Sequence, residues 1–287
     1  MVLRTNATRL VETAVTGAVS QPGLRYPGYS LDADGTGTVL PGMAGVVYNV
    51  RVGDAAFGWA ADHVEPGVSL AHAEEGGDFA LHYLTCIGNE AVVTSGLAKG
   101  SRGVVTGEHA RILVHFPEEA NALLSVGDAV QIRAHGRGLA LIDYPHIELK
   151  KVSPRLLEAM RVEALDDRRV TLPVAMELPV RIMGSGAELN SEYVDQDLMS
   201  GDRALMRDLG IDTLRLGDLV AIRHADHHFG RSYREGAVSI ALCIHGDSVM
   251  TGHGPGILTL MTCADPCIEW TLERSANLAD CGLLEAV

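Results

Sequence analysis

A heptapeptide that occurs twice constrains the fold of this chain more than any other feature. Residues 127–133 read Gly-Asp-Ala-Val-Gln-Ile-Arg and residues 217–223 read Gly-Asp-Leu-Val-Ala-Ile-Arg, so both have the form Gly-Asp-x-Val-x-Ile-Arg. Glycine permits a tight turn, and the apolar residues that follow alternate with a period of two, as in a half-buried strand. A Gly-Asp turn that leads into such a strand is common in β-barrels. Each copy precedes a histidine and a glycine, so the pair indicates related β units in two halves of the chain, without a sustained repeat period.

The rest of the chain also favours a mainly β fold with few short helices. A helix is expected to begin at Ser153-Pro154, because serine is a good N-cap and proline suits the first helical position; it extends to residue 165. A second short helix is expected over residues 201–209, with Gly210 as its stop. Strands are expected over residues 10–19, 46–50, 79–86, 111–116, 169–176, 237–244 and 259–262, with a hairpin over 91–107 and a helical turn over 117–124.

The first helix also marks the boundary that we predict between two halves. We expect an N-terminal β domain over residues 1–150 and a C-terminal β domain over residues 151–287, packed together as one unit. The tail from Leu272 is expected to be helical and to pack on the surface or on a partner. We expect the protein to be a homo-oligomer.

Composition excludes several classes of protein. The chain has 287 residues, of which 47% are hydrophobic and 21% charged, so it can bury a large core. Its net charge of -14 argues against nucleic acid or an anionic membrane as partner, because phosphate contacts need clustered lysine and arginine. The five cysteines are scattered and odd in number, which predicts buried free thiols in a reducing compartment. No apolar leader is visible, and we expect a cytoplasmic protein.

A glycine-rich segment over residues 183–186 could bind an anion through its backbone amides, so we predict that Gly184, Ser185 and Gly186 contact substrate. No Lys-Ser/Thr pair and no clear helix follow this segment, which excludes a P-loop and a Rossmann turn. We therefore expect no nucleotide cofactor. A Gly-x-Ser-x-Gly nucleophile elbow is also absent from the sequence.

Residues 216–256 contain five of the twelve histidines and are expected to form one wall of a polar pocket. Asp226 and His228 share a face of an extended segment, His245 ends the next predicted strand, and His253 lies in a glycine-rich loop. Adjacent strands can bring such residues within ligand distance, and imidazoles with carboxylates suit Zn²⁺, Fe²⁺ or Mn²⁺. We predict His63, His228, His245 and His253 as metal ligands and Asp226 as a catalytic carboxylate. The alternative is a set of surface histidines beside a core strand.

His63 itself lies in a second polar stretch. On an extended chain His63 and Glu65 point to the same face, which suits either a metal or a proton-transfer pair. The alternative is an ordinary hydrogen-bonded pair beside the Pro66-Gly67 turn. Further candidates are Asp62 and Gly254 for substrate binding, and Glu65, Asn89 and Glu90 for catalysis.

Several motifs together resemble a known family. These motifs are Gly45-Val46-Val47-Tyr48-Asn49-Val50, residues 62–69, Cys86-Ile87-Gly88-Asn89-Glu90-Ala91, Met183-Gly184-Ser185-Gly186 and Gly252-His253-Gly254-Pro255-Gly256. They are similar to a bacterial and archaeal family known only as a domain of unknown function and first seen through structural genomics. The resemblance implies a mostly β protein, with a small barrel-like part and a layered β-sandwich part, and it implies no activity. Gly107-Glu108-His109-Ala110 departs from the more glycine-rich family pattern, so His109 is left out of the predicted site.

Two classes of function follow from these features. The first is a metal-assisted hydrolase or lyase that acts on a small polar metabolite, with cleavage of an amide or cyclic-amide C–N bond preferred. The second is a non-catalytic β protein that binds a small ligand or a metal. Both predict a small-molecule ligand in a pocket lined by histidines.

Overall fold

The computed structural model describes residues 3–23, 30–32, 34–184 and 195–285. The fold is mainly β, as the sequence predicts, and its N-terminal part is a closed six-stranded barrel in the order β1-β4-β7-β6-β5-β8. All six barrel strands contribute apolar residues to one hydrophobic core, and most of these residues are fully buried. The barrel strands are β1 (Thr13–Val19), β4 (Val68–Ala71), β5 (Glu90–Val93), β6 (Arg102–Glu108), β7 (Ile112–His115) and β8 (Ala129–Ala134).

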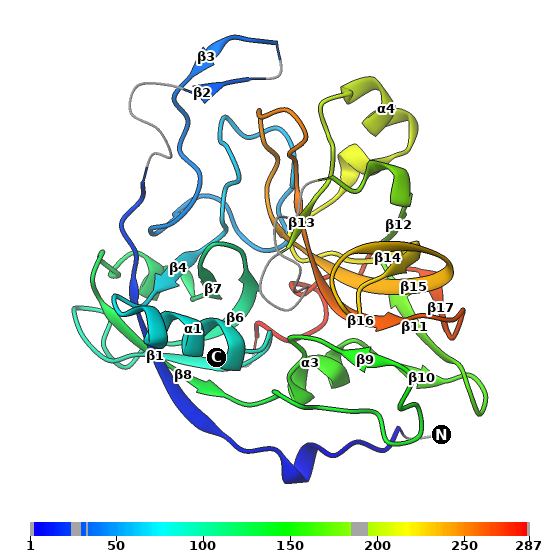
Figure 1. Ribbon diagram of the computed structural model, residues 1–287. Helices are drawn as coiled ribbons and strands as arrows, with labels where there is room; N and C mark the ends of the chain where they lie inside the picture. Colours follow the sequence, from blue (N-terminus) through cyan, green and yellow to red (C-terminus); the bar gives the residue numbers. More distant parts are fainter. Residues whose placement is uncertain (1–2, 24–29, 33, 185–194, 286–287) are drawn as a thin grey trace.

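The C-terminal part is built on a six-stranded sheet beside the barrel (Figure 1). Its strands follow the order β12-β14-β15-β16-β13, and β9 pairs with β16. The sheet contains β9 (Glu148–Leu149), β12 (Met176–Leu178), β13 (Gln196–Asp197), β14 (Leu219–Asp226), β15 (Ser232–His245) and β16 (Gly256–Cys263). Smaller sheets contain β10 (Glu163–Ala164), β11 (Val170–Val174) and β17 (Ile268–Leu272), and β2 (Ser30–Leu31) with β3 (Gly37–Thr38).

The helices of the described chain are short. Ser153 caps α3 (Pro154–Ala159) by accepting a hydrogen bond from the Leu156 N–H, as the Ser-Pro signal predicts, although the helix ends earlier than expected. None of these helices is long and apolar enough to cross a membrane. The others are α1 (Glu75–Leu84), α2 (Glu118–Asn121), α4 (Arg203–Asp208) and the 3-10 helices η1 (Ala7–Arg9), η2 (Val180–Ile182) and η3 (Ile211–Thr213).

The repeated heptapeptide forms the same turn in both parts. Gly127 and Gly217 have φ of +90° and +86°, a region that favours glycine. The aspartate after each glycine accepts a hydrogen bond from a backbone N–H three residues earlier, at 2.9 Å for Asp128 and 2.8 Å for Asp218. The apolar residues that follow enter β8 of the barrel and β14 of the sheet.

A close approach between β6 and β15 joins the barrel to the sheet. A Cβ atom at Gly107 would lie 3.2 Å from the Cβ of Ile244, so glycine lets the two strands pack tightly. Buried residues of both parts form one continuous apolar cluster. As a result, the turn that follows β6 lies next to the end of β15.

Three expectations about secondary structure are wrong. Residues 79–86 are mostly helical, because they continue α1, whose Leu81 packs over Gly17 of β1. Residues 46–50 form no strand beyond a single bridge from Val46 to Val68, because the preceding Ala44 and Gly45 adopt positive φ. The tail after β17 forms turns instead of a helix.

The cysteines also differ from the expectation. The structure joins Cys263 and Cys267 in a disulfide, whereas Cys86, Cys243 and Cys281 are free. The pair closes a turn between β16 and β17. The interpretation of all five as free thiols is therefore wrong for these two.

Candidate metal centre

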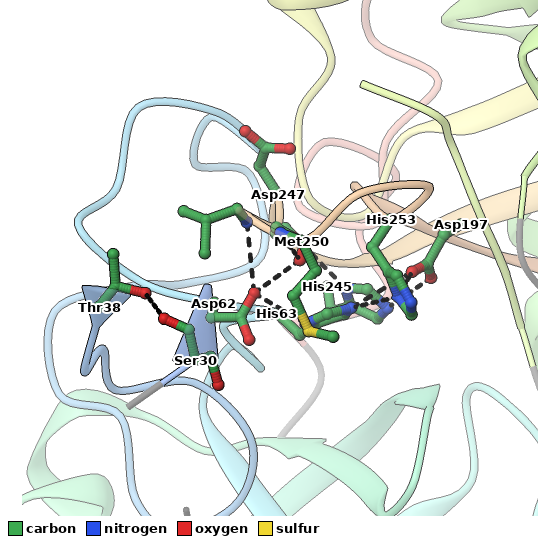
Figure 2. A network of polar contacts seen from close by, with 12 residues as sticks. Ser30, Thr38, Asp62, His63, Asp197, His245, Asp247, Met250 and His253 are labelled. Carbon is green, nitrogen blue, oxygen red and sulfur yellow. Dashed lines mark hydrogen bonds and ion pairs between the residues drawn. The ribbon is translucent and has the colours of Figure 1, made fainter. Parts of the chain in front are cut away.

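A cluster of histidines and carboxylates lies where loops of the barrel meet one end of the sheet. Figure 2 shows its central residues pointing toward one another. The loop before β4 is fixed against the sheet by the His63 N–H, which donates to the Asp247 carbonyl at 3.0 Å, and by the Gly246 N–H, which donates to the Val64 carbonyl at 2.9 Å. The cluster consists of Asp62, His63 and Glu65 from this loop, His109 after β6, Asp195 and Asp197 at β13, His245 at the end of β15, and His253 before β16.

Three of these residues, His63, Asp197 and His253, form what we call the first triad. His63 Nε2 lies 3.2 Å from Asp197 Oδ2 and 3.1 Å from His253 Nδ1, and His253 Nδ1 lies 2.8 Å from the same Asp197 oxygen. Atoms bound to one ion at about 2.0–2.2 Å are separated by about 2.8–3.6 Å in octahedral or tetrahedral geometry. The first triad is therefore spaced as the ligands of one ion are.

A second triad, His109, Asp195 and His245, lies beside the first. The rings of His109 and His245 are 4.2 Å apart between centroids, and His245 Nε2 lies 2.8 Å from Asp195 Oδ2. Neither of these two atoms has an aligned hydrogen-bond partner among the described residues, although both are buried. Buried polar atoms without hydrogen bonds are uncommon in folded proteins. Their approach to each other is typical of two ligands that face one cation.

In three of the four imidazoles, the ring nitrogen that points away from the two triads has a polar group beside it. His109 Nδ1 lies 2.9 Å from Glu65 Oε1, His245 Nδ1 donates to the Gly246 carbonyl at 2.8 Å, and His63 Nδ1 lies 3.1 Å from Asp62 Oδ1. A carboxylate or carbonyl at this position fixes the ring and its tautomer in metal sites. In these three rings, Nε2 is therefore the atom that could bind a metal ion.

Glu65 is fully buried, and both oxygens of its carboxylate have polar partners. It accepts hydrogen bonds from the Ala44 N–H at 2.7 Å and the Ser69 hydroxyl at 2.6 Å, in addition to its contact with His109. Burial alone would raise the pKa of Glu65, but the hydrogen bond and charge of His109 and these donors outweigh it, so the pKa is lowered. Glu65 therefore suits the role of holding His109.

The imidazoles and carboxylates of the cluster also stabilise one another as ions. Burial lowers the pKa of His245, but Asp195 and Asp197 more than offset this effect and raise it well above 6.5. Burial raises the pKa of Asp197, and the neighbouring imidazoles of His245 and His63 outweigh it and lower the pKa. The pKa of Asp62 falls to about 2, because the neighbouring His63 imidazole and the hydrogen bond from Ser248 outweigh burial. The carboxylates thus require positive charge nearby, which protons supply in the metal-free chain.

The backbone is shaped tightly around the cluster. His63 has φ of +56°, an uncommon conformation for a residue other than glycine, and such strain is typically found at functional sites. A Cβ atom at Gly256 would lie 2.0 Å from Asp195 Oδ2 and 2.1 Å from His245 Nε2. Glycine is therefore the only residue that leaves these two atoms in place.

The structure brings several of the predicted site residues together. His63, His245 and His253 lie in the cluster, with Asp62 and Glu65 next to them. The N–H of Gly184 donates to the Asp197 carbonyl at 2.7 Å, and Gly254 packs closely against the Leu198 carbonyl. Ser185 and Gly186 lie outside the described residues.

Two predicted residues of the same stretch lie elsewhere. His228 Nδ1 contacts Asp226 Oδ1 at 2.7 Å, near the end of β14. Asp226 pairs with Ser232 at the start of β15, whereas His245 is the last residue of that strand. A 14-residue strand is roughly 40 Å long, so the prediction that His228 and His245 lie in one metal site is wrong.

Asn89 and Glu90 are also separate from the cluster. Asn89 is buried in the barrel, where its side chain accepts from the Cys86 N–H and donates to the His135 carbonyl. Glu90 forms an ion pair with Arg102 on the neighbouring strand. These contacts indicate that both residues stabilise the barrel.

The sequence reasoning missed Asp195, Asp197 and His109. Two carboxylates at positions i and i+2 share a face of an extended segment, and this signal was present in Asp195-Gln196-Asp197. The sequence predicts no strand over these residues, so the two carboxylates are not among the predicted site residues. His109 was set aside for its departure from the family pattern, yet it lies 2.9 Å from Glu65 in the cluster.

Comparisons with known proteins identify the family. Fold and cluster define a mainly β protein in which a six-stranded barrel meets a second sheet at a buried group of histidines and carboxylates. The chain belongs to the family described as a domain of unknown function (DUF4438), whose N-terminal model matches residues 29–158 and whose C-terminal model matches residues 159–281. The expected resemblance to a family of unknown function is confirmed.

A solved structure is also similar to this chain. It is titled "Crystal structure of TM1086", has 42% sequence identity and a TM-score of 0.92, and the match covers 97% of this chain and 98% of that chain. A search of curated proteins found no match.

Proposed function

We propose that this protein is a metal-assisted hydrolase or lyase that acts on a small polar metabolite, and that the bond it cleaves is an amide or cyclic-amide C–N bond. One observation carries the proposal: four histidines and two aspartates from separate segments converge with the spacing of metal ligands. Neutral imidazoles and carboxylates are the preferred ligands of Zn²⁺, Fe²⁺ and Mn²⁺. The proposed cofactor is one of these ions.

The chemistry follows from what such an ion does to a bound water and a carbonyl. It lowers the pKa of the water toward 7 and polarises the carbonyl oxygen. In amide hydrolysis, the water oxygen bonds to the carbonyl carbon, the C–N bond breaks, and the proton from the water ends on the departing nitrogen. The sequence has no Gly-x-Ser-x-Gly elbow that would supply a serine nucleophile, which favours an activated water.

Access to the cluster favours a small substrate. The side chains of His253 and His109 are 25% and 14% exposed, whereas those of the other four ligands are at most 7% exposed. A substrate would therefore approach the cluster beside these two histidines. A cytoplasmic location and a homo-oligomeric state remain predictions, and light scattering of the purified protein tests the second.

Activity assays of metal-loaded protein test the proposal. Protein purified without a histidine tag is loaded with Zn²⁺, Fe²⁺ or Mn²⁺ and incubated with small amides, lactams and cyclic imides, and the release of amine or ring-opened acid is measured. Turnover is expected in the wild type, with a loss of at least 100-fold in His253→Ala and none in His228→Ala. Stoichiometric metal without turnover of any substrate would instead favour a non-catalytic metal-binding protein.

A further inference from the structure

We propose that the cluster holds two divalent ions, one in each triad, and that the carboxylate of Asp197 bridges them. This inference deepens the proposed function, because it rests on metal binding at the same cluster. It adds the number of ions, their ligands and the residue between them.

The orientation of Asp197 supports a bridge. Its Oδ2 lies 3.2 Å from His63 Nε2 and 2.8 Å from His253 Nδ1, in the first triad. Its Oδ1 lies 3.4 Å from His245 Nε2, in the second triad. Because 3.4 Å is the separation expected for two ligands of one tetrahedral ion, each oxygen of this carboxylate faces its own triad. A bridging group between ions about 3.5–4 Å apart is typical of two-metal hydrolytic sites.

The second triad has its own evidence for an ion, independent of Asp197. Asp195 Oδ2 and His245 Nε2 are buried and lack hydrogen-bond partners among the described residues, although they lie 2.8 Å apart. Gly256 leaves open the space beside both atoms, where any side chain would intrude. Glu65 holds Nδ1 of His109, which leaves its Nε2 for the same ion.

Charge balance favours two ions over one. Four carboxylates lie in or directly against the cluster, namely Asp62, Glu65, Asp195 and Asp197, and together they carry a formal charge of -4 when ionised. Two divalent ions neutralise this charge while all four imidazoles remain neutral and able to bind metal. A single divalent ion would neutralise only half of the -4 charge. Protonated imidazoles would have to balance the other half, and a protonated nitrogen cannot bind metal.

Metal counting on the full wild-type chain tests the proposal. The metal-free protein is saturated with Mn²⁺ and desalted, and manganese per chain is measured by mass spectrometry alongside the EPR spectrum. Two ions per chain and a spectrum of exchange-coupled Mn²⁺ are expected. The work is done without reductant, so that the disulfide of Cys263 and Cys267 cannot open into a thiolate site beside His146.

One ion per chain at saturation, with the six-line spectrum of isolated Mn²⁺, would overturn the two-ion proposal. If such protein still hydrolyses amides, the proposed function stands without the second ion. If manganese is not retained and loading with Zn²⁺ or Fe²⁺ also leaves no metal on the chain, both proposals fail together.

Variants locate the two ions. Gly256→Ala places a Cβ atom against Asp195 and His245 and is expected to reduce the count from two to one and abolish the coupled spectrum; His109→Ala tests the same triad without a new steric contact. His253→Ala is expected to remove the ion of the first triad, and His228→Ala, a histidine outside the cluster, to retain both. A count of two in both Gly256→Ala and His109→Ala would refute the assignment of the second ion.

Discussion

Replacement of Glu65 by glutamine tests whether this buried carboxylate sets the tautomer of His109. Glu65 Oε2 faces the Ala44 N–H and the Ser69 hydroxyl, and its Oε1 faces His109 Nδ1. In Glu65→Gln, an amide nitrogen directed at the Ala44 N–H would place two donors together, which costs about 1–3 kcal/mol when buried. The amide oxygen therefore stays on Ala44 and Ser69, and the amide nitrogen faces His109.

This orientation reverses the hydrogen bond to His109. Nδ1 must then accept, so the ring proton moves to Nε2, and Nε2 can no longer bind metal. Loss of such a supporting carboxylate typically weakens metal affinity 10–100-fold, about 1.4–2.7 kcal/mol. The fold should persist, because glutamine has nearly the same shape as glutamate.

Titration of the metal-free chain against a competing chelator measures the effect. One of two binding steps is expected to weaken 10–100-fold in Glu65→Gln, while the other is unchanged. Ser69→Ala is the matched control, because it removes a hydrogen bond to Glu65 that does not face His109. The reasoning is refuted if Glu65→Gln binds metal as the wild type does while His109→Ala loses a binding step.

Three further predictions concern stability. Zn²⁺ or Mn²⁺ at 100 times its dissociation constant should stabilise the wild type by about 2.7 kcal/mol for each bound ion, roughly 5 °C in Tm per ion, and His253→Ala by clearly less. Equal shifts of the two proteins in thermal scans would place the metal elsewhere. Burial lowers the pKa of His227 to about 3 from 6.5, so stability falls as pH drops from 6.5 toward 3, when the unfolded chain takes up a proton that the folded chain resists. Between pH 7 and pH 5, the free energy of unfolding of His227→Asn should therefore fall by about 2 kcal/mol less than that of the wild type, as measured by urea unfolding of metal-free protein. An equal fall in the two proteins would contradict this. Ser153→Ala should cost about 1 kcal/mol, because Ser153 caps α3, with Ser153→Thr nearly neutral; an alanine variant as stable as the wild type would argue against the cap.

Local patterns were sufficient to predict much of the barrel and sheet. The Gly-Asp turns before β8 and β14, the hairpin of β5 and β6, and the cap of α3 all depend on neighbouring residues. By contrast, the prediction of a strand over residues 79–86 is wrong. It ignores the acidic first turn with which helix α1 begins at Glu75. Periodicity alone does not distinguish helix from strand in a short apolar segment.

The site was harder to predict, because long-range packing assembles it. Asp197 enters the cluster only through the pairing of the two-residue strand β13 with β16, where Asp197 lies opposite Gly256. His109 reaches the cluster because Gly107 brings β6 against β15. No local pattern shows either contact. The spacing of Asp226 and His228 was correct for a shared face, but it could not show that this face lies at the far end of β15 from His245.

Anomalous diffraction from crystals grown with Mn²⁺ or Zn²⁺ tests the central claim most directly. Data collected at the absorption edge of the metal are expected to show two peaks, one about 2.0–2.2 Å from His63 Nε2, His253 Nδ1 and Asp197, the other at the same distance from His245 Nε2 and Asp195. No peak within the cluster, or metal bound only beside Asp226 and His228, would contradict the account.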